Sequence, residues 1–270
     1  MPKAISEHVA RVAWFRRHIV VTVVGCGGTG AQVAMGLPYL HQALLADGHP
    51  YGLRVFLVDG DQITETNCVR QPFARSEIGL YKVVVLINRL NLFWGLDWEA
   101  VPHFVQSGQD LPDSDFLISC VDTRAARATL ARIVSLKSRR FGYHLDAGNL
   151  EDRGQFVLGQ PLRKDRKDRE KRLPCVHELF PSIIHARADK RDRLPACSAA
   201  EALRLQQPFL NSILANHVLA LLARLLREGR ISYHGGFVNL ATGQVSPLLV
   251  SPSIWARMRK SAEKESRHLR

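Results

Sequence analysis

Apolar runs that end in glycine or aspartate recur along the first half of the chain. Residues 19–24, IVVTVV, are β-branched and lead directly into glycines, so we expect a strand buried on both faces. The same reasoning predicts strands at 54–58, 115–121 and 141–146, and helices over 31–46, 79–90 and 124–138. Pro38 should kink the first helix or end its first part. The alternation predicts a doubly wound, mostly parallel, Rossmann-like α/β sheet with right-handed crossovers.

This alternation breaks down after residue 159. Residues 163–172, RKDRKDREKR, cannot face a core, and we expect 160–198 to be a long, mobile excursion. Order should return with a helix over about 199–227, interrupted near Pro208, then strands near 232–239 and 244–250 and a basic helix from about 253. We therefore predict a single domain over 1–270. Its parts would be a core over 19–159, the excursion over 160–198 and a C-terminal α/β extension over 199–270.

Composition narrows the class of protein. The 270 residues suffice for a substantial core, and 46% hydrophobic with 23% charged residues exclude wholesale disorder. No apolar run is long enough to span a bilayer, and the N-terminus lacks the apolar core of a signal peptide. Five cysteines without framework spacing argue against a disulfide-stapled protein. We expect a soluble, cytoplasmic protein.

The net charge of +12 is concentrated in the second half. Residues 1–150 carry 15 basic and 13 acidic side chains, whereas 151–270 carry 22 and 12. Such a basic surface attracts anionic partners. Because no aromatic-interleaved basic stretch or zinc finger accompanies the charge, we expect an acidic protein partner rather than nucleic acid.

A glycine turn follows the first strand. Gly25, Gly27, Gly28 and Gly30 allow a phosphate to approach the backbone, and the next helix would direct its N-terminal N–H groups at that phosphate. Asp59, at the end of the second strand, is placed to bind ribose hydroxyls. Alone, this pattern would also fit a dinucleotide-binding dehydrogenase.

The polar residues behind Asp59 favour ATP over NAD. Arg70 and Lys82 can neutralise a triphosphate, and Asn67 can orient a phosphate oxygen. Asp122, at the end of the third strand, would face the same crevice. A carboxylate beside bound triphosphate is a natural ligand for Mg²⁺. The sequence thus predicts a site for ATP and Mg²⁺.

These motifs together resemble the ThiF-type adenylating superfamily, which includes ThiF and MoeB proteins and ubiquitin-activating enzymes. The match covers about residues 19–127, and shorter matches after Cys197 resemble the ThiF members of PRTRC gene cassettes. The resemblance implies a homodimer that uses ATP to adenylate the C-terminal carboxylate of a small ubiquitin-like or sulfur-carrier-like protein, with release of pyrophosphate.

The resemblance also implies roles for individual residues. The four glycines would hold the nucleotide, Asp59 the ribose, and Asn67, Arg70 and Lys82 the phosphates. Asp122 matches the magnesium-associated aspartate of the family. Asp61 and Gln71 match the motif, and we assign them a supporting role in nucleotide binding.

The cysteines depart from the pattern of many relatives. The chain lacks the two CxxC pairs of a structural zinc site. Several relatives carry the activated acyl group as a thioester, and here Cys197 is the first candidate, with an ordinary reduced thiol as the alternative. Cys175 is the second candidate, and there an ordinary reduced thiol is the more expected of the two. Cys26, Cys68 and Cys120 lie in or beside predicted buried elements and should be inert.

Two other functions remain open at this stage. An NAD(P)-dependent oxidoreductase would use the same glycine turn, but it leaves Asn67, Arg70 and Lys82 unexplained. An ATP-binding scaffold without turnover would retain every motif residue, so sequence alone does not separate it from the enzyme.

Overall fold

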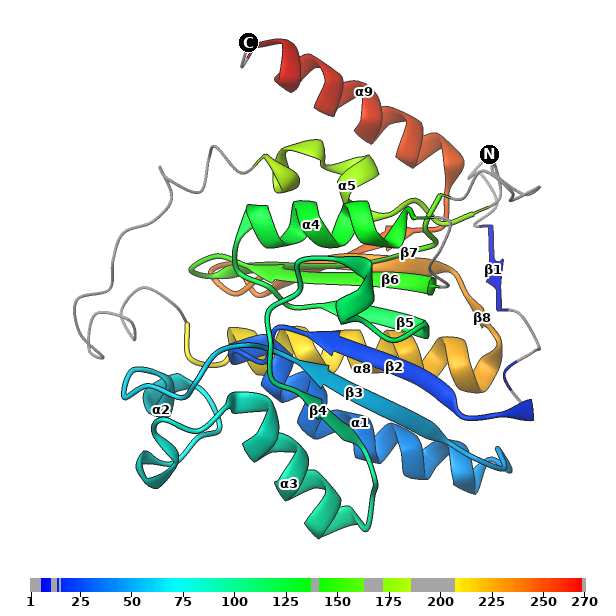
Figure 1. Ribbon diagram of the computed structural model, residues 1–270. Helices are drawn as coiled ribbons and strands as arrows, with labels where there is room; N and C mark the ends of the chain where they lie inside the picture. Colours follow the sequence, from blue (N-terminus) through cyan, green and yellow to red (C-terminus); the bar gives the residue numbers. More distant parts are fainter. Residues whose placement is uncertain are drawn as a thin grey trace.

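An eight-stranded sheet in the order β10-β9-β7-β6-β5-β2-β3-β4 organises the molecule (Figure 1). This computed structural model describes residues 6–10, 14, 16–136, 141–162, 172–185 and 207–268. The parallel strands are β2 (Ile19–Val24), β3 (Leu53–Val58), β4 (Glu99–Val101), β5 (Ser114–Ser119) and β6 (Phe141–Asn149). The antiparallel strands are β7 (Arg153–Gly159), β9 (Tyr233–Asn239) and β10 (Gln244–Leu249). The prediction of a doubly wound, mostly parallel sheet is therefore confirmed.

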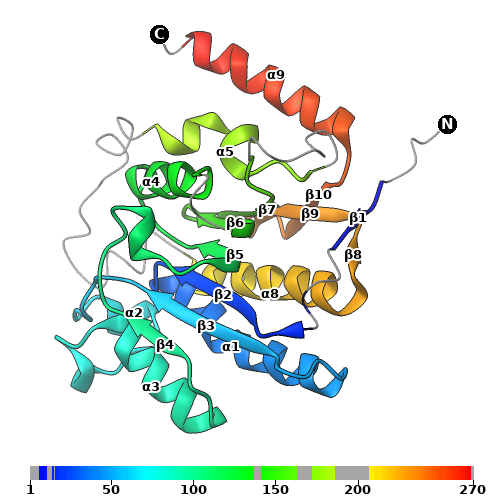
Figure 2. The same cartoon turned by 45° about the vertical axis from the view of Figure 1, so that its right-hand side comes forward.

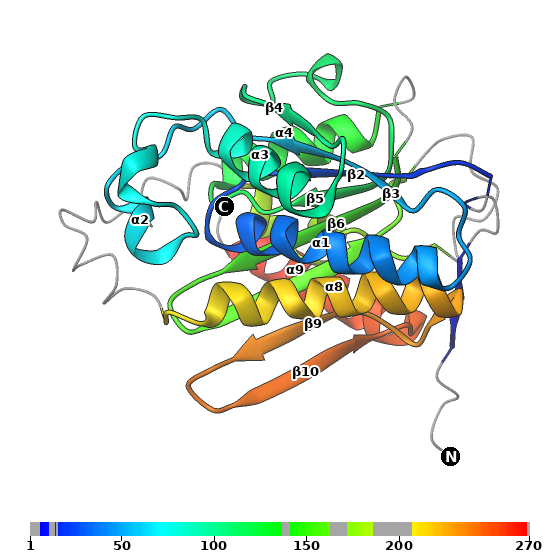
Figure 3. The ribbon, with the colours of Figure 1, turned by 90° about the horizontal axis from the view of Figure 1, so that it is seen from below.

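Helices cover both faces of this sheet. On one face lie α1 (Gly28–Ala46), α3 (Lys82–Trp94) and α8 (Leu210–Glu228) (Figures 1 and 3). On the other lie α4 (Arg124–Val134), α5 (Val176–Leu179) and α9 (Pro252–His268). Short helices interrupt the connections: α2 (Asn67–Arg70), η2 (Arg75–Glu77), η3 (Gly108–Asp110) and η4 (Pro181–Ile184). Figure 2 shows β1 (His8–Val9) beside β8 (Arg230–Ile231), with which it pairs. Within the described ranges, no helix is both long and apolar enough to cross a membrane.

The buried strands separate two apolar layers. On the α1 and α8 side, Val21 and Phe116 belong to the large core cluster. On the α4 side, Leu117 packs with Leu130 and Ile133 in a smaller cluster. Because alternate residues of a strand face opposite sides of a sheet, strands covered on both faces must be apolar at almost every position. This explains the uninterrupted apolar runs in the sequence.

The helices differ in several details from the sequence prediction; α1 begins at Gly28, and α4 ends at Val134. Pro38 neither ends α1 nor divides it, because it is buried inside a helix that packs along α8. The helix expected from Gly79 starts at Lys82 instead. Gly79 has a φ of 90°, which is incompatible with a right-handed helix.

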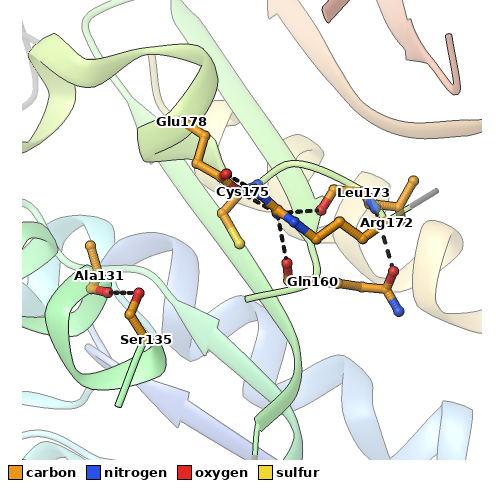
Figure 4. A network of polar contacts seen from close by, with 7 residues as sticks. All are labelled: Ala131, Ser135, Gln160, Arg172, Leu173, Cys175 and Glu178. Atoms are coloured by element: carbon orange, nitrogen blue, oxygen red, sulfur yellow. Dashed lines mark hydrogen bonds and ion pairs between the residues drawn. The ribbon is translucent and has the colours of Figure 1, made fainter. Parts of the chain in front are cut away.

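Part of the expected mobile excursion is folded. Residues 172–185 form α5 and η4, and the buried Arg172 anchors them (Figure 4). Its guanidinium donates hydrogen bonds to the backbone oxygen of Gln160, at 3.0 Å, and to both carboxylate oxygens of Glu178. Glu178 also accepts from the Cys175 N–H at 2.8 Å. The expectation of mobility over 160–198 is thus wrong for 172–185, because a buried ion pair holds the segment. Residues 163–171 and 186–206 lie outside the described ranges.

Candidate active site

A cavity of about 730 Å³ opens at the carboxyl ends of the parallel strands. From β2 the sheet continues to β3 on one side and to β5 on the other, so the cavity lies where the strand order reverses. Ligands of doubly wound sheets bind at this point. Ten of the predicted site residues line the cavity: Gly25, Gly27, Gly28, Asp59, Asp61, Asn67, Arg70, Gln71, Lys82 and Asp122.

The glycine turn is shaped by close backbone contacts. Gly25 has a φ of 85°, and a Cβ there would lie 2.9 Å from the carbonyl oxygen of Cys120. At Gly30 a Cβ would lie 1.8 Å from the Gly25 carbonyl oxygen. Gly30 is not among the residues that line the cavity. The close contact gives Gly30 a packing role, which lets α1 begin directly against the turn, and its nucleotide contact stays a prediction.

Asp59 connects the glycine turn to the next strand. One carboxylate oxygen accepts from the Cys26 N–H at 2.6 Å, and the other accepts from the Asp61 N–H at 2.9 Å. Burial raises the pKa of Asp59, and these two hydrogen bonds and Lys82 oppose that increase. The carboxylate thus orders the turn, and it also lines the cavity where a ribose would reach it.

Lys82 is held inside the cavity wall at the start of α3. Its Nζ lies 2.9 Å from Oδ2 of Asp61, and only 7% of its side chain is exposed. The backbone N–H of Lys82 also donates to the Asp61 carbonyl oxygen at 3.1 Å. These paired contacts fix an ammonium in the cavity wall at the start of α3.

The short helix α2 contributes Asn67 and Arg70 to the same wall. Asn67 is buried, and its Oδ1 accepts from the Thr64 N–H at 3.0 Å. The amide Nδ2 is therefore the group that Asn67 can direct at a phosphate. Gln71 follows directly, and its buried Oε1 has no hydrogen-bond partner among the described residues. Buried polar atoms usually have a hydrogen-bond partner, so this oxygen is placed to accept a hydrogen bond from a bound ligand.

Asp122 follows β5 and lies immediately before the helix α4. Thr123 caps that helix, since its Oγ1 accepts from the Ala126 N–H at 3.2 Å, and Asp122 is left to line the cavity. The described part of the chain contains no cluster of three acidic, histidine or cysteine side chains that could hold a metal. One carboxylate suits Mg²⁺ that arrives with a nucleotide, because this ion takes most of its ligands from phosphates and water.

The remaining wall of the cavity is apolar. Val121 lines it from the connection after β5, Ala126 and Leu130 from α4, and Val105 from the loop after β4. The Phe104 ring lies so close to Gly60 that a Cβ there would be 2.7 Å from it. An apolar wall and an exposed aromatic ring suit a nucleotide base, whereas the cationic wall suits its phosphates.

Sequence reasoning missed four polar residues of the site. Thr29, His103, Asn149 and Asn211 also line the cavity. Asn211 belongs to α8, far along the chain, and only the fold brings it to the glycine turn. Thr29, a polar residue inside that turn, was the one local signal.

Three of the four cysteines in the described segments, Cys26, Cys120 and Cys175, are poorly suited to acyl transfer. Cys175, the second thioester candidate, is completely buried beneath Gly159. Burial also raises the pKa of the Cys26 thiol well above its usual value and that of Cys120 to about 12. The expectation for Cys175 is therefore wrong, because α5 folds onto the sheet. Cys197 lies outside the described residues.

A second cavity, of about 790 Å³, adjoins the first. The two share Asp122, Thr123, Asn149 and Leu150 in their walls. Three arginines line the second cavity: Arg124, Arg127 and Arg153. Its other walls include the aromatic pair Phe180 and Phe237, whose ring centres are 5.8 Å apart. An elongated anionic or amphipathic ligand could therefore extend from one cavity into the other.

Comparisons with known proteins agree with this geometry. No curated protein sequence matches the chain. A crystal structure of E. coli MccB with ATP is similar at 17% identity and a TM-score of 0.56, over 86% of this chain and 64% of MccB. E. coli MccB with MccA gives 18% identity and a TM-score of 0.57, over 86% and 63%.

A PaaA structure gives 14% identity and a TM-score of 0.55, over 86% of this chain and 64% of PaaA. The chain thus spans less than two thirds of each of these proteins, and at such identities the similarity shows the fold. The ThiF family model matches residues 16–261, which is most of the sequence. The chain belongs to the ThiF family.

Proposed function

We propose that this protein uses ATP to adenylate the C-terminal carboxylate of a small peptide or protein. The observation that carries the proposal is the convergence of Asp59, Arg70, Lys82 and Asp122 on one cavity at the glycine turn. A dehydrogenase has no use for two cations and a second carboxylate there.

The reaction needs positioning and charge neutralisation more than covalent help from the protein. A carboxylate oxygen of the partner attacks the α-phosphorus of ATP. The bond from that phosphorus to the oxygen bridging to the β-phosphate breaks, and pyrophosphate leaves with the bonding electron pair. Lys82 and Arg70 stabilise negative charge on the phosphates, and Asp59 holds the ribose. Mg²⁺ held by Asp122 and the phosphates would supply further charge neutralisation.

The second cavity supports a route for the partner's C-terminus. It meets the nucleotide cavity at Asp122 and Asn149, and its three arginines suit the acidic partner that the net charge favours. Arg127 is held by the buried Asp146, with 3.3 Å between Nε and Oδ2. The structural neighbour E. coli MccB was solved with MccA. For this chain we infer a partner whose last residues carry acidic and apolar side chains.

Two further features belong to the proposal. We infer that two copies associate, since an apolar groove of about 1210 Å³ between α1, α3 and α8 exposes Tyr39, Leu92 and Phe93. We also retain a ubiquitin-like or sulfur-carrier-like substrate, the relation to PRTRC cassettes and a thioester on Cys197 as predictions. Trapping an adduct that is lost with reductant and in Cys197→Ser would test the thioester.

The first experiment is a melt of the full chain with ATP and Mg²⁺, ATP and EDTA, NAD or NADPH. Ligand at about 100 times its dissociation constant should stabilise the fold by about 2.7 kcal/mol. We expect stabilisation by ATP and Mg²⁺, with a smaller effect in Asp122→Ala. Stabilisation by NAD or NADPH instead would overturn the proposal.

Turnover is tested by pyrophosphate release with small proteins or peptides that end in a free carboxylate. The same partners with an amidated C-terminus are the matched control, because they lack the nucleophile. Binding of ATP with no pyrophosphate from any partner would favour the scaffold.

A further inference from the structure

The amide of Asn211 lies against the second half of the glycine turn. A Cβ on Gly28 would lie 2.4 Å from Nδ2 of Asn211 and 3.0 Å from its Oδ1. Gly28 does not have a positive φ, so its backbone conformation does not require glycine. A side chain at this position would have to displace the Asn211 amide, which comes from α8. Figure 3 shows α8 lying beside α1.

Two hydrogen bonds fix the orientation of this amide. Oδ1 of Asn211 accepts from Thr29 Oγ1 at 3.0 Å and from Asn149 Nδ2 at 2.6 Å. Asn211 is buried, so these partners determine which end of the amide faces the turn. The oxygen is engaged by α1 and β6, and the nitrogen lies on the side of Gly28.

The turn beside this nitrogen is the start of α1. Gly27 is the N-cap residue and makes no side-chain capping hydrogen bond. The first N–H groups of a helix attract an anion, and a phosphate bound there would lie beside Gly28. An amide NH₂ at this place adds N–H donors from outside the turn. Asn211, Thr29 and Asn149 all line the nucleotide cavity.

We propose that Asn211 is a phosphate-binding residue, which donates N–H to an oxygen of the nucleotide's α-phosphate at the glycine turn. Thr29 and Asn149 are positioning residues that act through the Asn211 amide. The inference rests on the proposed ATP site and adds a donor from α8 to it. As the α-phosphate is attacked, charge grows on its oxygens, and a donor already in place stabilises that charge without rearrangement.

The test measures binding of α,β-methylene-ATP with Mg²⁺ to the full chain by calorimetry. Asn211→Asp preserves the size of the side chain and the acceptor for Thr29 and Asn149, but it removes the N–H donors and adds a negative charge. We expect the dissociation constant to rise about 10- to 100-fold. Asn88→Asp, at an exposed asparagine of α3 that lines neither cavity nor the apolar groove, is the matched control, and its affinity should stay within about two-fold of wild type.

Adenosine, which has no phosphate, separates a phosphate contact from a general distortion of the cavity. Its affinity for Asn211→Asp should stay within about two-fold of wild type. Equal loss of adenosine and nucleotide binding would overturn the proposal. Thr29→Val removes one tether without a change of charge, and should weaken nucleotide binding about 3-fold or more. If Asn211→Asp does not fold, wild-type affinity in Thr29→Val overturns the proposal.

The result distinguishes this inference from the proposed function. If the wild type fails to bind α,β-methylene-ATP, the ATP site itself is wrong. If the wild type binds and Asn211→Asp binds equally well, only the role of Asn211 is wrong.

Discussion

The carboxylate of Asp59 accepts a 2.6 Å hydrogen bond from the backbone N–H of Cys26, which joins the end of β3 to the turn after β2. The residue expected to bind ribose thus also orders the turn expected to bind phosphate. Nucleotide affinity and local stability are therefore coupled at this position.

Replacing Asp59 should reduce both properties. Asp59→Asn retains one oxygen that can accept a hydrogen bond. Its NH₂ group would face the backbone N–H of either Cys26 or Asp61, and two donors cannot bond to each other. We expect a loss of about 1–3 kcal/mol in the free energy of unfolding and about 10-fold or more in ATP affinity. Urea denaturation and calorimetry measure the two effects. The exposed Asp97→Asn is the control, and ATP affinity unchanged in Asp59→Asn would contradict the ribose assignment.

The pair Lys82 and Asp61 predicts a ligand-dependent stability. The Lys82 side chain is only 7% exposed, and Asp61→Asn removes the carboxylate that pairs with its ammonium. We therefore expect the free energy of unfolding to fall by about 1–2 kcal/mol. ATP should restore more stability to this variant than to the wild type, because its phosphates supply the missing charge. Thermal melts with and without ATP and Mg²⁺ measure the difference.

The ion pair of Arg227 with Asp47 provides the control for that experiment. Both side chains are more than 40% exposed, so Asp47→Asn should leave the free energy of unfolding nearly unchanged. An equal loss in both variants would show that Lys82 is not specially dependent on an anion.

The first half of the fold was predictable because its signals are local. Glycines directly follow the first apolar run, and an aspartate follows each of the next two. In a parallel sheet these positions lie at the carboxyl edge of the strands, and this placement does not depend on the rest of the chain. Gly25, Asp59 and Asp122 were identified in this way, and all three line one cavity.

The later part was less predictable because its contacts are long-range. Arg172 belongs to a run of charges that reads as a solvated loop, yet it is buried against Glu178. Asn211 contacts Thr29 of the glycine turn, which lies 182 residues earlier in the chain. The sequence of the helix around Asn211 does not indicate this contact. Only tertiary packing specifies such pairs.

The Arg172–Glu178 pair should be a major determinant of stability for residues 172–185. Burial alone would raise the pKa of Glu178, but the hydrogen bonds from Arg172 and from the Cys175 N–H bring it below its usual value. Glu178→Gln leaves the buried guanidinium without a counter-charge, so we expect a loss of about 3–5 kcal/mol in the free energy of unfolding. Glu228→Gln, in an exposed pair with Arg224, should leave the free energy of unfolding nearly unchanged.

Two buried histidines predict sensitivity to mild acid. Burial lowers the pKa of His144 and of His234 to about 4, against about 6.5 in the unfolded chain. Both must stay neutral in the fold, so their contribution to stability is complete above pH 6.5 and is lost as the pH falls toward 4. At pH 5 each histidine should lower the free energy of unfolding by about 2 kcal/mol relative to its value above pH 6.5.

Urea midpoints at several pH values measure this loss. His234→Asn can preserve the polar contact of Nδ1 with the Leu158 carbonyl oxygen but does not titrate, so its stability should fall less steeply between pH 6.5 and 5. If the stability of His234→Asn falls with pH as steeply as that of the wild type, His234 does not contribute to the acid sensitivity.

The apolar groove beside α3 predicts the surface through which two copies associate. Leu92 and Phe93 are 90% and 80% exposed, and Tyr39 on α1 extends the same surface. Exposed apolar groups of this size are costly in water and typical of an interface. Leu92→Glu with Phe93→Glu should convert a dimer to a monomer in light scattering, because two carboxylates would be buried at the contact. Val245→Glu, on the edge strand β10 away from the groove, should leave the dimer intact. A wild-type protein that is monomeric at all concentrations, or a double variant that still dimerises, would exclude this surface.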